Sequence, residues 1–370
     1  MYSRRPAVRP IERHMRVPKD IRILLSGPGL IGSKHAELLQ SNPHARIVAV
    51  VAPGENPLPD ALRSETVPRY ATIEDALKGE MIDAAIISSP NEFHHDQVMR
   101  CIEARLPTLV EKPLTDRLET AARLVEASDR HNVPVLVGHH RTYSPFLRLA
   151  REFLSSDAFG KPVTLQGSAL FTKPDAYFAA GPWRTKPGGG LILINLVHEI
   201  GIMRYLFGEV DRVTASLSNV TRGFEVEDSA AITFSFENGA LGTFILSDTS
   251  ASDKSWEMTA GENPAYPHFP DQNCYHFSGT NGSLDFPSMR YKTYEGCAER
   301  SWWSEFNEGR LPSEPIDPLS AQLQHFVDVI RGTAVPLVPT MDGYRNMVVL
   351  EAIRIAAREE RTVALSEILQ

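Results

Sequence analysis

Three closely spaced glycines could hold the phosphates of a dinucleotide. They lie between a predicted strand, 21–27, and a predicted helix, 33–39. In such a loop the first glycine permits a tight turn, the second lets backbone N–H groups approach a pyrophosphate, and the third lets helix and strand pack closely. A glycine turn that serves packing alone is the alternative. The residues predicted to bind the dinucleotide here are Gly27, Pro28, Gly29, Leu30, Ile31 and Gly32.

The end of the second predicted strand, 46–52, bears on which dinucleotide is bound. A carboxylate at this point would hold the adenosine ribose of NAD, and an arginine nearby would accommodate the 2′-phosphate of NADP. Pro53 and Gly54 follow the strand, Glu55 is the nearest carboxylate, and neither Arg nor Lys stands there. We expect NAD as the cofactor, with NADP as the alternative.

The elements that position this loop alternate between strand and helix patterns. Such alternation is typical of βαβ units around a parallel sheet. We therefore expect an α/β Rossmann domain with a doubly wound parallel sheet over 21–142. Its further strands are predicted at 46–52, 83–90, 108–113 and 133–139.

The pattern changes beyond Tyr143 to strands joined by hairpins, with turn signals at Asn238-Gly239 and Asn281-Gly282. This predicts an α+β domain over 143–370 with a large open, mainly antiparallel sheet, which binds substrate and forms oligomer contacts. One helix, 192–206, is inserted early, and the terminal helices, 321–332 and 343–359, can pack back on the first domain. The expected strands are 164–171, 212–220, 230–236, 240–247, 274–279 and 283–288.

The composition is that of a globular protein with an acidic surface. The 370 residues include 38 Lys and Arg against 46 Asp and Glu, a formal net charge of −8, which disfavours a nucleic-acid partner. This length exceeds the roughly 250 residues that one core usually supports, so we expect two domains. No apolar run reaches the roughly 20 residues that cross a bilayer, so no membrane partner is expected.

The cysteines bear on metal binding and location. Cys101, Cys274 and Cys297 are odd in number and far apart, without CxxC or Cys/His spacing, so neither a disulfide framework nor a metal site is expected. A reducing compartment fits this pattern, and we expect a cytoplasmic protein. The basic segment 1–20 is expected to be a disordered arm, or an over-long start before Met15, with a targeting role as the alternative.

Several fragments together resemble one family, the glucose-fructose oxidoreductase, inositol dehydrogenase and rhizopine-catabolism family (Gfo/Idh/MocA). The resemblance extends over nearly everything from Ile21 onward. The fragments are GPGLIG (27–32) with His35 after it, SSPNEFHH (88–95), VEKP (110–113), WR (183–184), GGGLILINLVH (188–198) and IRGTAVPLVPTMDG (330–343).

The resemblance implies NAD(P)-dependent oxidation of a polyol, sugar or related alcohol. It implies that Lys112 is the catalytic lysine beside the nicotinamide, that His198 is the acid/base histidine, and that Asn91 lies near the nicotinamide ribose. The Lys112-Pro113 peptide is expected to be cis, as is common in this family. The further residues expected to contact the cofactor are Ser89, Pro90, Asn91, His94, Glu111 and Lys112.

One departure from the family pattern concerns the substrate. The usual motif carries Asp four residues before the histidine, where this chain has Ile194, and Asn195 stands next to it. Spacings of three and four share a helix face, so Asn195 can still reach the substrate, although an amide cannot act as a carboxylate. Gly201 replaces the Asp that commonly follows the histidine by three.

The side chains themselves fit alcohol oxidation. A neutral imidazole can take the hydroxyl proton near neutral pH, and a lysine ammonium can donate to the oxygen. We assign His198 as general base and Lys112 as its electrostatic partner, roles that could be exchanged, with Asn195 as the third catalytic residue. The residues expected to contact substrate are Arg141, Tyr143, Trp183, Arg184, Asn195 and His198.

These expectations define an NAD(P)-dependent dehydrogenase acting on CH–OH groups of a sugar, inositol-like polyol or sugar acid. A glycoside hydrolase or eliminase that oxidises its substrate transiently with bound NAD is a second hypothesis. A non-catalytic dinucleotide-binding sensor is the third, favoured by the loss of Asp at Ile194. The expected partners are a small-molecule substrate and a further copy of the chain, in a homodimer or homotetramer formed through the C-terminal sheet.

Overall fold

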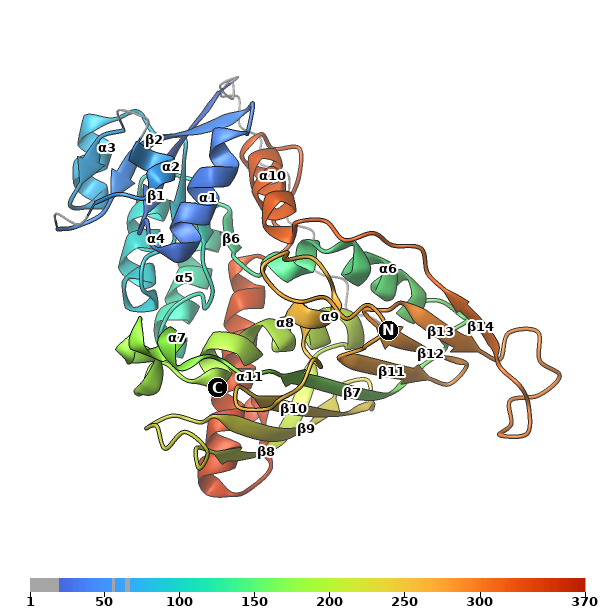
Figure 1. Ribbon diagram of the computed structural model, residues 1–370. Coiled ribbons are helices and arrows are strands. Elements are labelled where there is room, and N and C mark those ends of the chain that lie inside the picture. The colour runs from blue at the N-terminus through green and yellow to red at the C-terminus, as the bar shows by residue number, and fades with distance from the viewer. Residues whose placement is uncertain (1–19, 55–56, 64–66, 370) are drawn as a thin grey trace. The chain divides into compact units, whose positions relative to one another are not determined.

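The computed structural model describes residues 20–54, 57–63 and 67–369 (Figure 1). The described chain divides into two compact units, one formed by 20–140 with 319–345 and the other by 141–318 with 346–369. The boundary lies at 140/141 rather than at the predicted 142/143. Residues 319–345, which were predicted to belong to 143–370 and to be able to pack back on the first domain, are part of the first unit. The predicted arm 1–20, apart from its last residue, and the carboxylate of Glu55 lie outside the described residues.

The first unit contains a six-stranded parallel sheet in the order β3-β2-β1-β4-β5-β6. This confirms the predicted doubly wound Rossmann fold. Strand order reverses between β1 and β4, and ligands of such sheets bind beyond the carboxyl ends of the strands at this point. The strands are β1 (Ile21–Ser26), β2 (Ala45–Val51), β3 (Arg69–Tyr70), β4 (Ala84–Ile87), β5 (Thr108–Val110) and β6 (Val135–Val137).

The helices of this unit begin and end at recognisable signals. Thr72 accepts a hydrogen bond from Asp75 N at the start of α3, and Asn132 adopts the left-handed conformation after α5. The helices are α1 (Leu30–Gln40), α2 (Asp60–Arg63), α3 (Ile73–Gly79), η1 (Asn91–Phe93), α4 (His94–Glu103), α5 (Leu118–His131), α10 (Pro318–Ile330, from Leu319 onward) and the first turns of α11 (Thr340–Glu359).

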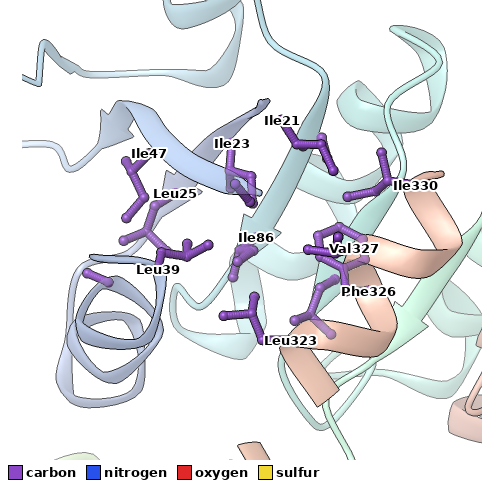
Figure 2. Packing of buried hydrophobic residues seen from close by; sticks show 14 of the residues in the cluster. Ile21, Ile23, Leu25, Leu39, Ile47, Ile86, Leu323, Phe326, Val327 and Ile330 are labelled. Atoms are coloured by element: carbon purple, nitrogen blue, oxygen red, sulfur yellow. The ribbon is translucent and has the colours of Figure 1, made fainter. Parts of the chain in front are cut away.

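Helix α10 completes the core of this unit, as Figure 2 shows. Its apolar side chains lie among the buried residues of β1 and β4, which are apolar along nearly their whole length because both faces of a parallel sheet are covered. The labelled members of this cluster are Ile21, Ile23, Leu25, Leu39, Ile47, Ile86, Leu323, Phe326, Val327 and Ile330.

The second unit contains a nine-stranded sheet in the order β14-β13-β12-β11-β7-β10-β9-β8-β15. All neighbours run antiparallel except β7 and β10, which are parallel. This confirms the predicted open, mainly antiparallel sheet. The strands are β7 (Pro162–Leu170), β8 (Val210–Ser218), β9 (Ser229–Phe236), β10 (Leu241–Ser247), β11 (Tyr275–Gly279), β12 (Gly282–Phe286), β13 (Arg290–Thr293), β14 (Asn307–Arg310) and β15 (Val363–Ala364).

Helices cover one face of this sheet, where Phe207 packs its ring 5.3 Å from that of Phe236 and 5.7 Å from that of Phe277, centroid to centroid. On β10 the opposite side chains, Leu241 and Ile245, are exposed. The helices are η2 (His140–Tyr143, from Arg141 onward), α6 (Pro145–Leu154), α7 (Asp175–Ala179), η3 (Pro182–Thr185), η4 (Ile192–Leu196), α8 (Val197–Phe207), α9 (Trp256–Thr259), the rest of α11 and η5 (Leu365–Glu367).

The helix predicted over 192–206 is not regular. Its first five residues, η4, form a π-helix, and the α-helix α8 begins only at Val197. The first N–H of η4, on Ile192, donates to the carboxylate of Glu227 at 2.7 Å. The predicted helix is therefore present, but its first turn is π-helical rather than α-helical, and its first N–H is bonded to a side chain 35 residues away.

Across the residues that the structure describes, no helix is both long and apolar enough to cross a bilayer.

Candidate active site

Two of the three motif glycines are required by the backbone. Gly27 follows β1 with φ +81°, and a Cβ there would lie 2.4 Å from the backbone N of Ser89. A Cβ on Gly32 would lie 2.2 Å from the carbonyl oxygen of Gly27. The turn and the packing of α1 onto β1 therefore both require glycine, as the motif predicts.

The middle glycine faces open space. A Cβ on Gly29 would meet no atom within 4 Å, and no side chain caps the helix that begins after it. The first turn of α1 holds no acidic residue, and Leu30 is almost fully exposed. Unpaired N–H groups at a helix N-terminus attract phosphate. The turn, including Pro28 and Ile31, therefore fits the pyrophosphate of a dinucleotide.

The loop after β4 is bonded directly to this turn. The hydroxyl of Ser88 donates to the carbonyl oxygens of Gly27 at 2.8 Å and Ser26 at 3.0 Å. The neighbouring Ser89 hydroxyl donates to Gln97 on α4 at 2.7 Å. The loops at the carboxyl ends of β1 and β4 thus form one continuous surface.

His94 joins the loop after β4 to the loop after β5. Its Nδ1 lies 2.9 Å from the carbonyl oxygen of Pro113, and its Nε2 lies 2.9 Å from that of Ser89. Burial lowers the pKa of His94, although both carbonyls oppose this. His94 therefore holds the predicted cofactor loop in place from its buried side. On the same loop, Pro90 is exposed and Asn91 is partly exposed, so both are accessible from solvent.

The loop after β5 carries Glu111 and Lys112. The Lys112-Pro113 peptide is cis, as expected. Oε1 of Glu111 lies 2.9 Å from Nε2 of His35 on α1, with both side chains buried. Burial alone would raise the pKa of Glu111, but the hydrogen bond with His35 and the charges of His140 and Lys112 lower it. Lys112 itself is partly exposed.

In the second unit, Asn195 and His198 lie on consecutive turns, across the junction of η4 and α8. His198 is buried, with 8% of its surface exposed, and Asn195 is partly exposed. Oδ1 of Asn195 accepts a hydrogen bond from Nζ of Lys173 at 2.7 Å. The polar side chain next to Ile194, which stands where the family has its aspartate, is therefore held by a cation.

Arg141 lies in a buried network. It binds the carboxylates of Glu199, at 2.6 Å, and Glu257, and the hydroxyl of Tyr275 donates to Glu199. Burial raises the pKa of Glu199, against the opposing charge of Arg141. The guanidinium predicted to contact substrate is thus engaged by two protein carboxylates. Tyr143 is partly buried, which raises its pKa.

Trp183 and Arg184 lie in the short helix η3. The guanidinium of Arg184 stacks 4.0 Å from the ring centroid of Tyr177 and donates to the carbonyl oxygen of Tyr177. Trp183 is half exposed. Arg184 therefore packs within its own unit, and Trp183 is the more accessible of the two predicted contacts.

Two side chains of these sites were not among the predicted site residues. The family fragments include His35 without predicting a role for it, and the sequence pattern predicts no role for Lys173. A histidine inside the helix of a glycine turn gives a weak signal for the former, and a lone lysine after a strand gives none for the latter. Among the described residues, no cluster of His, Cys, Asp or Glu could hold a metal ion.

The fold and glycine turn define a protein of the NAD-binding Rossmann class, and comparisons with known proteins agree. Residues 21–139 match the family model described as the oxidoreductase family, NAD-binding Rossmann fold, and residues 147–285 match the GFO/IDH/MocA C-terminal domain. The chain belongs to the Gfo/Idh/MocA family of NAD-binding oxidoreductases. This confirms the predicted family, the dehydrogenase class and the NAD cofactor.

Similar proteins extend over almost the whole chain. D-apiose dehydrogenase of Paraburkholderia graminis is 24% identical over 95% of this chain and 91% of its own length. The NAD-dependent scyllo-inositol 2-dehydrogenase of Bacillus subtilis is 27% identical over 89% and 91%. The crystal structure of the WlbA dehydrogenase of Chromobacterium violaceum, in complex with NADH and UDP-GlcNAcA, superposes with a TM-score of 0.74 at 23% identity, over 94% of this chain and 97% of that one.

Proposed function

We propose that this oxidoreductase oxidises a secondary alcohol of a sugar, an inositol-like polyol or a sugar acid. The observation that carries the proposal is the joining of three loops at one edge of the parallel sheet. Ser88, His94 and His35 bond the glycine turn, the loop after β4 and the Lys112 loop to one another. The named relatives that oxidise apiose and inositol support this substrate class.

The glycine turn and first turn of α1 would hold the pyrophosphate, and Ser89, Pro90 and Asn91 would line the rest of the cofactor site. NAD, when bound, accepts the hydride from the alcohol carbon. Lys112, which extends from the end of β5, donates a hydrogen bond to the substrate oxygen and stabilises the negative charge that develops there. Glu111, buried against His35, fixes the backbone that carries this lysine.

His198 takes the hydroxyl proton as general base. Imidazole is suited to this step because it exchanges protons near neutral pH. Asn195, three residues earlier, contacts the substrate through its amide. We propose that Lys112 and His198 act on the same hydroxyl: His198 accepts its proton, and the ammonium of Lys112 stabilises the charge that develops on its oxygen.

The test is NADH formation by the full-length protein on myo-inositol, D-glucitol, D-glucose, D-gluconate and D-glucuronate. We expect stoichiometric NADH from at least one substrate, and we expect Lys112→Ala to lower kcat by about 10²–10⁴-fold. Lys78→Ala, which alters an exposed lysine of the same unit, serves as the control and should leave kcat unchanged. Wild-type turnover by Lys112→Ala would refute the assignment.

The same experiment separates the two rival functions. A hydrolase that uses bound NAD transiently would consume a glycoside, such as a p-nitrophenyl glycoside, without NADH accumulation. A sensor would bind NADH yet convert no substrate. Replacement of the family aspartate by Ile194 is the observation behind the sensor hypothesis, and retention of Lys112 and His198 opposes it.

We also propose that the exposed face of the nine-stranded sheet pairs with a second copy of the chain. The outward side chains of β9 and β10 are small or apolar and carry no charge, among them Ala231, Thr233, Leu241, Thr243 and Ile245. Light scattering should give a dimer or tetramer that Ile245→Glu dissociates, and a monomeric wild type would refute this.

We propose in addition that the protein is cytoplasmic. The thiols of Cys101 and Cys274 are buried and form no disulfide, which supports a reducing compartment.

A further inference from the structure

A largely buried lysine holds the amide of Asn195 in one orientation. Nζ of Lys173 lies 2.7 Å from Oδ1 of Asn195. An ammonium group has only donors, so the amide oxygen, and not the amide nitrogen, must face it. The Nδ2 donors of Asn195 therefore point elsewhere. Within the described part of the chain no protein atom accepts from Nδ2, and Asn195 is partly exposed.

Lys173 is itself firmly held. Its backbone N–H donates to the carbonyl oxygen of Asp248 at 2.9 Å, and its Nζ lies 3.4 Å from Oδ2 of the same residue. The ammonium lies 5.0 Å from the ring centroid of Tyr177 and 5.7 Å from that of Phe171. Only 12% of the side chain is exposed. Because Lys173 has little freedom, the amide that it orients is fixed as well.

The charges around this pair do not repel an anion. The carboxylate of Asp248 forms ion pairs with both Lys173 and Arg222, and Nε of Arg222 lies 2.8 Å from Oδ1 of Asp248. Asp228, also buried, accepts hydrogen bonds from the backbone N–H of Arg222 and the hydroxyl of Ser229. The remaining carboxylate that acts on Lys173, that of Glu257, is bound by Arg141. Each nearby carboxylate thus has its own donors, and the amide of Asn195 offers an incoming group a donor beside a cation.

Asn195 stands three residues before His198, and the preceding residue, Ile194, is apolar. An aspartate on this helix face would offer only acceptors and a negative charge, and would favour hydroxyl donors. An amide turned by Lys173 offers donors and favours an oxygen that can only accept. Hydrogen bonds to an ionised acceptor are about twice as strong as neutral ones.

We propose that Lys173 is a positioning residue which, through Asn195, makes the enzyme select hydroxylated carboxylates of the sugar-acid type over neutral polyols. This inference rests on the proposed function, in which His198 and Asn195 face the substrate. Lys173 does not touch the reacting atoms. It acts by presenting the Nδ2 donors to the substrate carboxylate and by keeping the site free of negative charge.

The test compares matched probes, D-gluconate with D-glucitol and D-glucuronate with D-glucose, at saturating NAD. The readout is the ratio of kcat/KM for the acid to that for its neutral partner. We expect wild type to favour the acids. Asn195→Asp, which is nearly isosteric, should lower the ratio at least tenfold, through KM for the acid. Lys173→Met should lower the ratio because the amide can then turn, and Lys173→Arg should restore it to within about threefold.

A binding measurement accompanies the kinetics. Calorimetry of D-gluconate and D-glucitol with the NADH-loaded protein should show tighter acid binding, weakened in Asn195→Asp. A wild type that favours neutral probes, or an acid-to-neutral ratio unchanged within twofold in Asn195→Asp, would overturn the inference. If NADH forms on both classes without selection, only the role of Lys173 fails. If NADH forms on no probe, the proposed function fails, and the calorimetric ratio alone decides the role of Lys173.

The pH profile gives a readout that a purely structural role would not move. Burial lowers the pKa of Lys173, Asp248 opposes this, Arg222 adds to it, and Glu257 opposes it. Lys173 therefore loses its proton at lower pH than an exposed lysine, and a neutral amine no longer fixes the amide. Selection for the acid should decline in the alkaline range in wild type but persist in Lys173→Arg. Identical profiles for the two proteins would contradict the proposed role.

Discussion

Nε2 of His35 lies 2.9 Å from Oε1 of Glu111, and neither side chain is accessible to more than a trace of solvent. The pair joins the helix that follows the glycine turn to the loop that carries Lys112, although 76 residues separate the two partners in the chain. Gly138 lies so close to this carboxylate that a Cβ added to it would be 2.9 Å from Oε2 of Glu111. The cofactor loop and the lysine are thereby fixed to each other.

Breaking this pair should destabilise the protein. His35→Leu leaves a buried carboxylate without its partner, which costs about 3–5 kcal/mol of unfolding free energy. The pKa of Glu111 is lowered in the folded state, so the pair stabilises the protein fully above the carboxyl's ordinary range and loses that contribution as pH falls through the lowered pKa. Urea unfolding of wild type should show this loss under acid conditions. His35→Gln, which keeps a donor, should be affected less, and equal stability of all three proteins would refute the role.

Substitutions of two motif glycines should have different effects, one on NAD affinity and the other on the free energy of unfolding. Gly29→Ala adds a methyl group into open space, so unfolding free energy should stay within about 0.5 kcal/mol, while Kd for NAD rises at least tenfold. Gly32→Ala places a methyl group 2.2 Å from a carbonyl oxygen and should cost about 1–3 kcal/mol of stability. Calorimetry with NAD and thermal unfolding distinguish the two. Unchanged NAD affinity in Gly29→Ala would mean that the dinucleotide does not bind against the backbone of Gly29.

Arg141 should prove more important for stability than for substrate recognition. Arg141→Met removes the cation from the buried Glu199, which then keeps only the hydroxyl of Tyr275 as a donor, at a cost of about 3–5 kcal/mol. Arg148, exposed and paired with Glu152, provides a matched control, since loss of a surface pair costs about 0–1 kcal/mol. Chemical denaturation measures both. Full stability of Arg141→Met together with a raised KM would instead support the predicted substrate contact.

Glu262 should make stability fall as pH rises from the acid range up to about pH 7. Burial raises its pKa to about 7, while the hydroxyl of Ser144 and the indole N–H of Trp256 act in the opposite direction. The folded protein therefore holds a proton that the unfolded chain releases above about pH 4.3, so the free energy of unfolding falls by about 1–3 kcal/mol in total between about pH 4 and 7 and levels off above pH 7. Thermal unfolding between about pH 4 and 8 should show this slope below about pH 7 and little of it above. Glu262→Gln should flatten it, and an equal slope in the variant would contradict the assignment.

The sequence pattern predicted five strands of the first unit because each is a nearly continuous apolar run, but it missed β3, Arg69–Tyr70, which is two residues long and not apolar. It predicted the glycine loop because the spacing of the glycines follows from backbone geometry. Short strands such as β13, Arg290–Thr293, escaped prediction because they are largely polar and lie near the edge of the sheet. The π-helix and the Lys173–Asn195 bond escaped it for another reason. Each involves a side chain that is distant in sequence, Glu227 for the π-helix and Lys173 for Asn195. Only the folded structure brings these side chains next to their partners.

The central claim is that Lys112 and His198 act on one hydroxyl group. The direct test is a double-mutant cycle in kcat, with Lys112→Met, His198→Asn and the double variant assayed on the best substrate at saturating NAD. We predict that each single change lowers kcat at least 100-fold and that the double variant is little slower than the worse single, because groups that act as a unit are not additive. Wild-type kcat in either single variant, or losses that multiply in the double variant, would contradict the account.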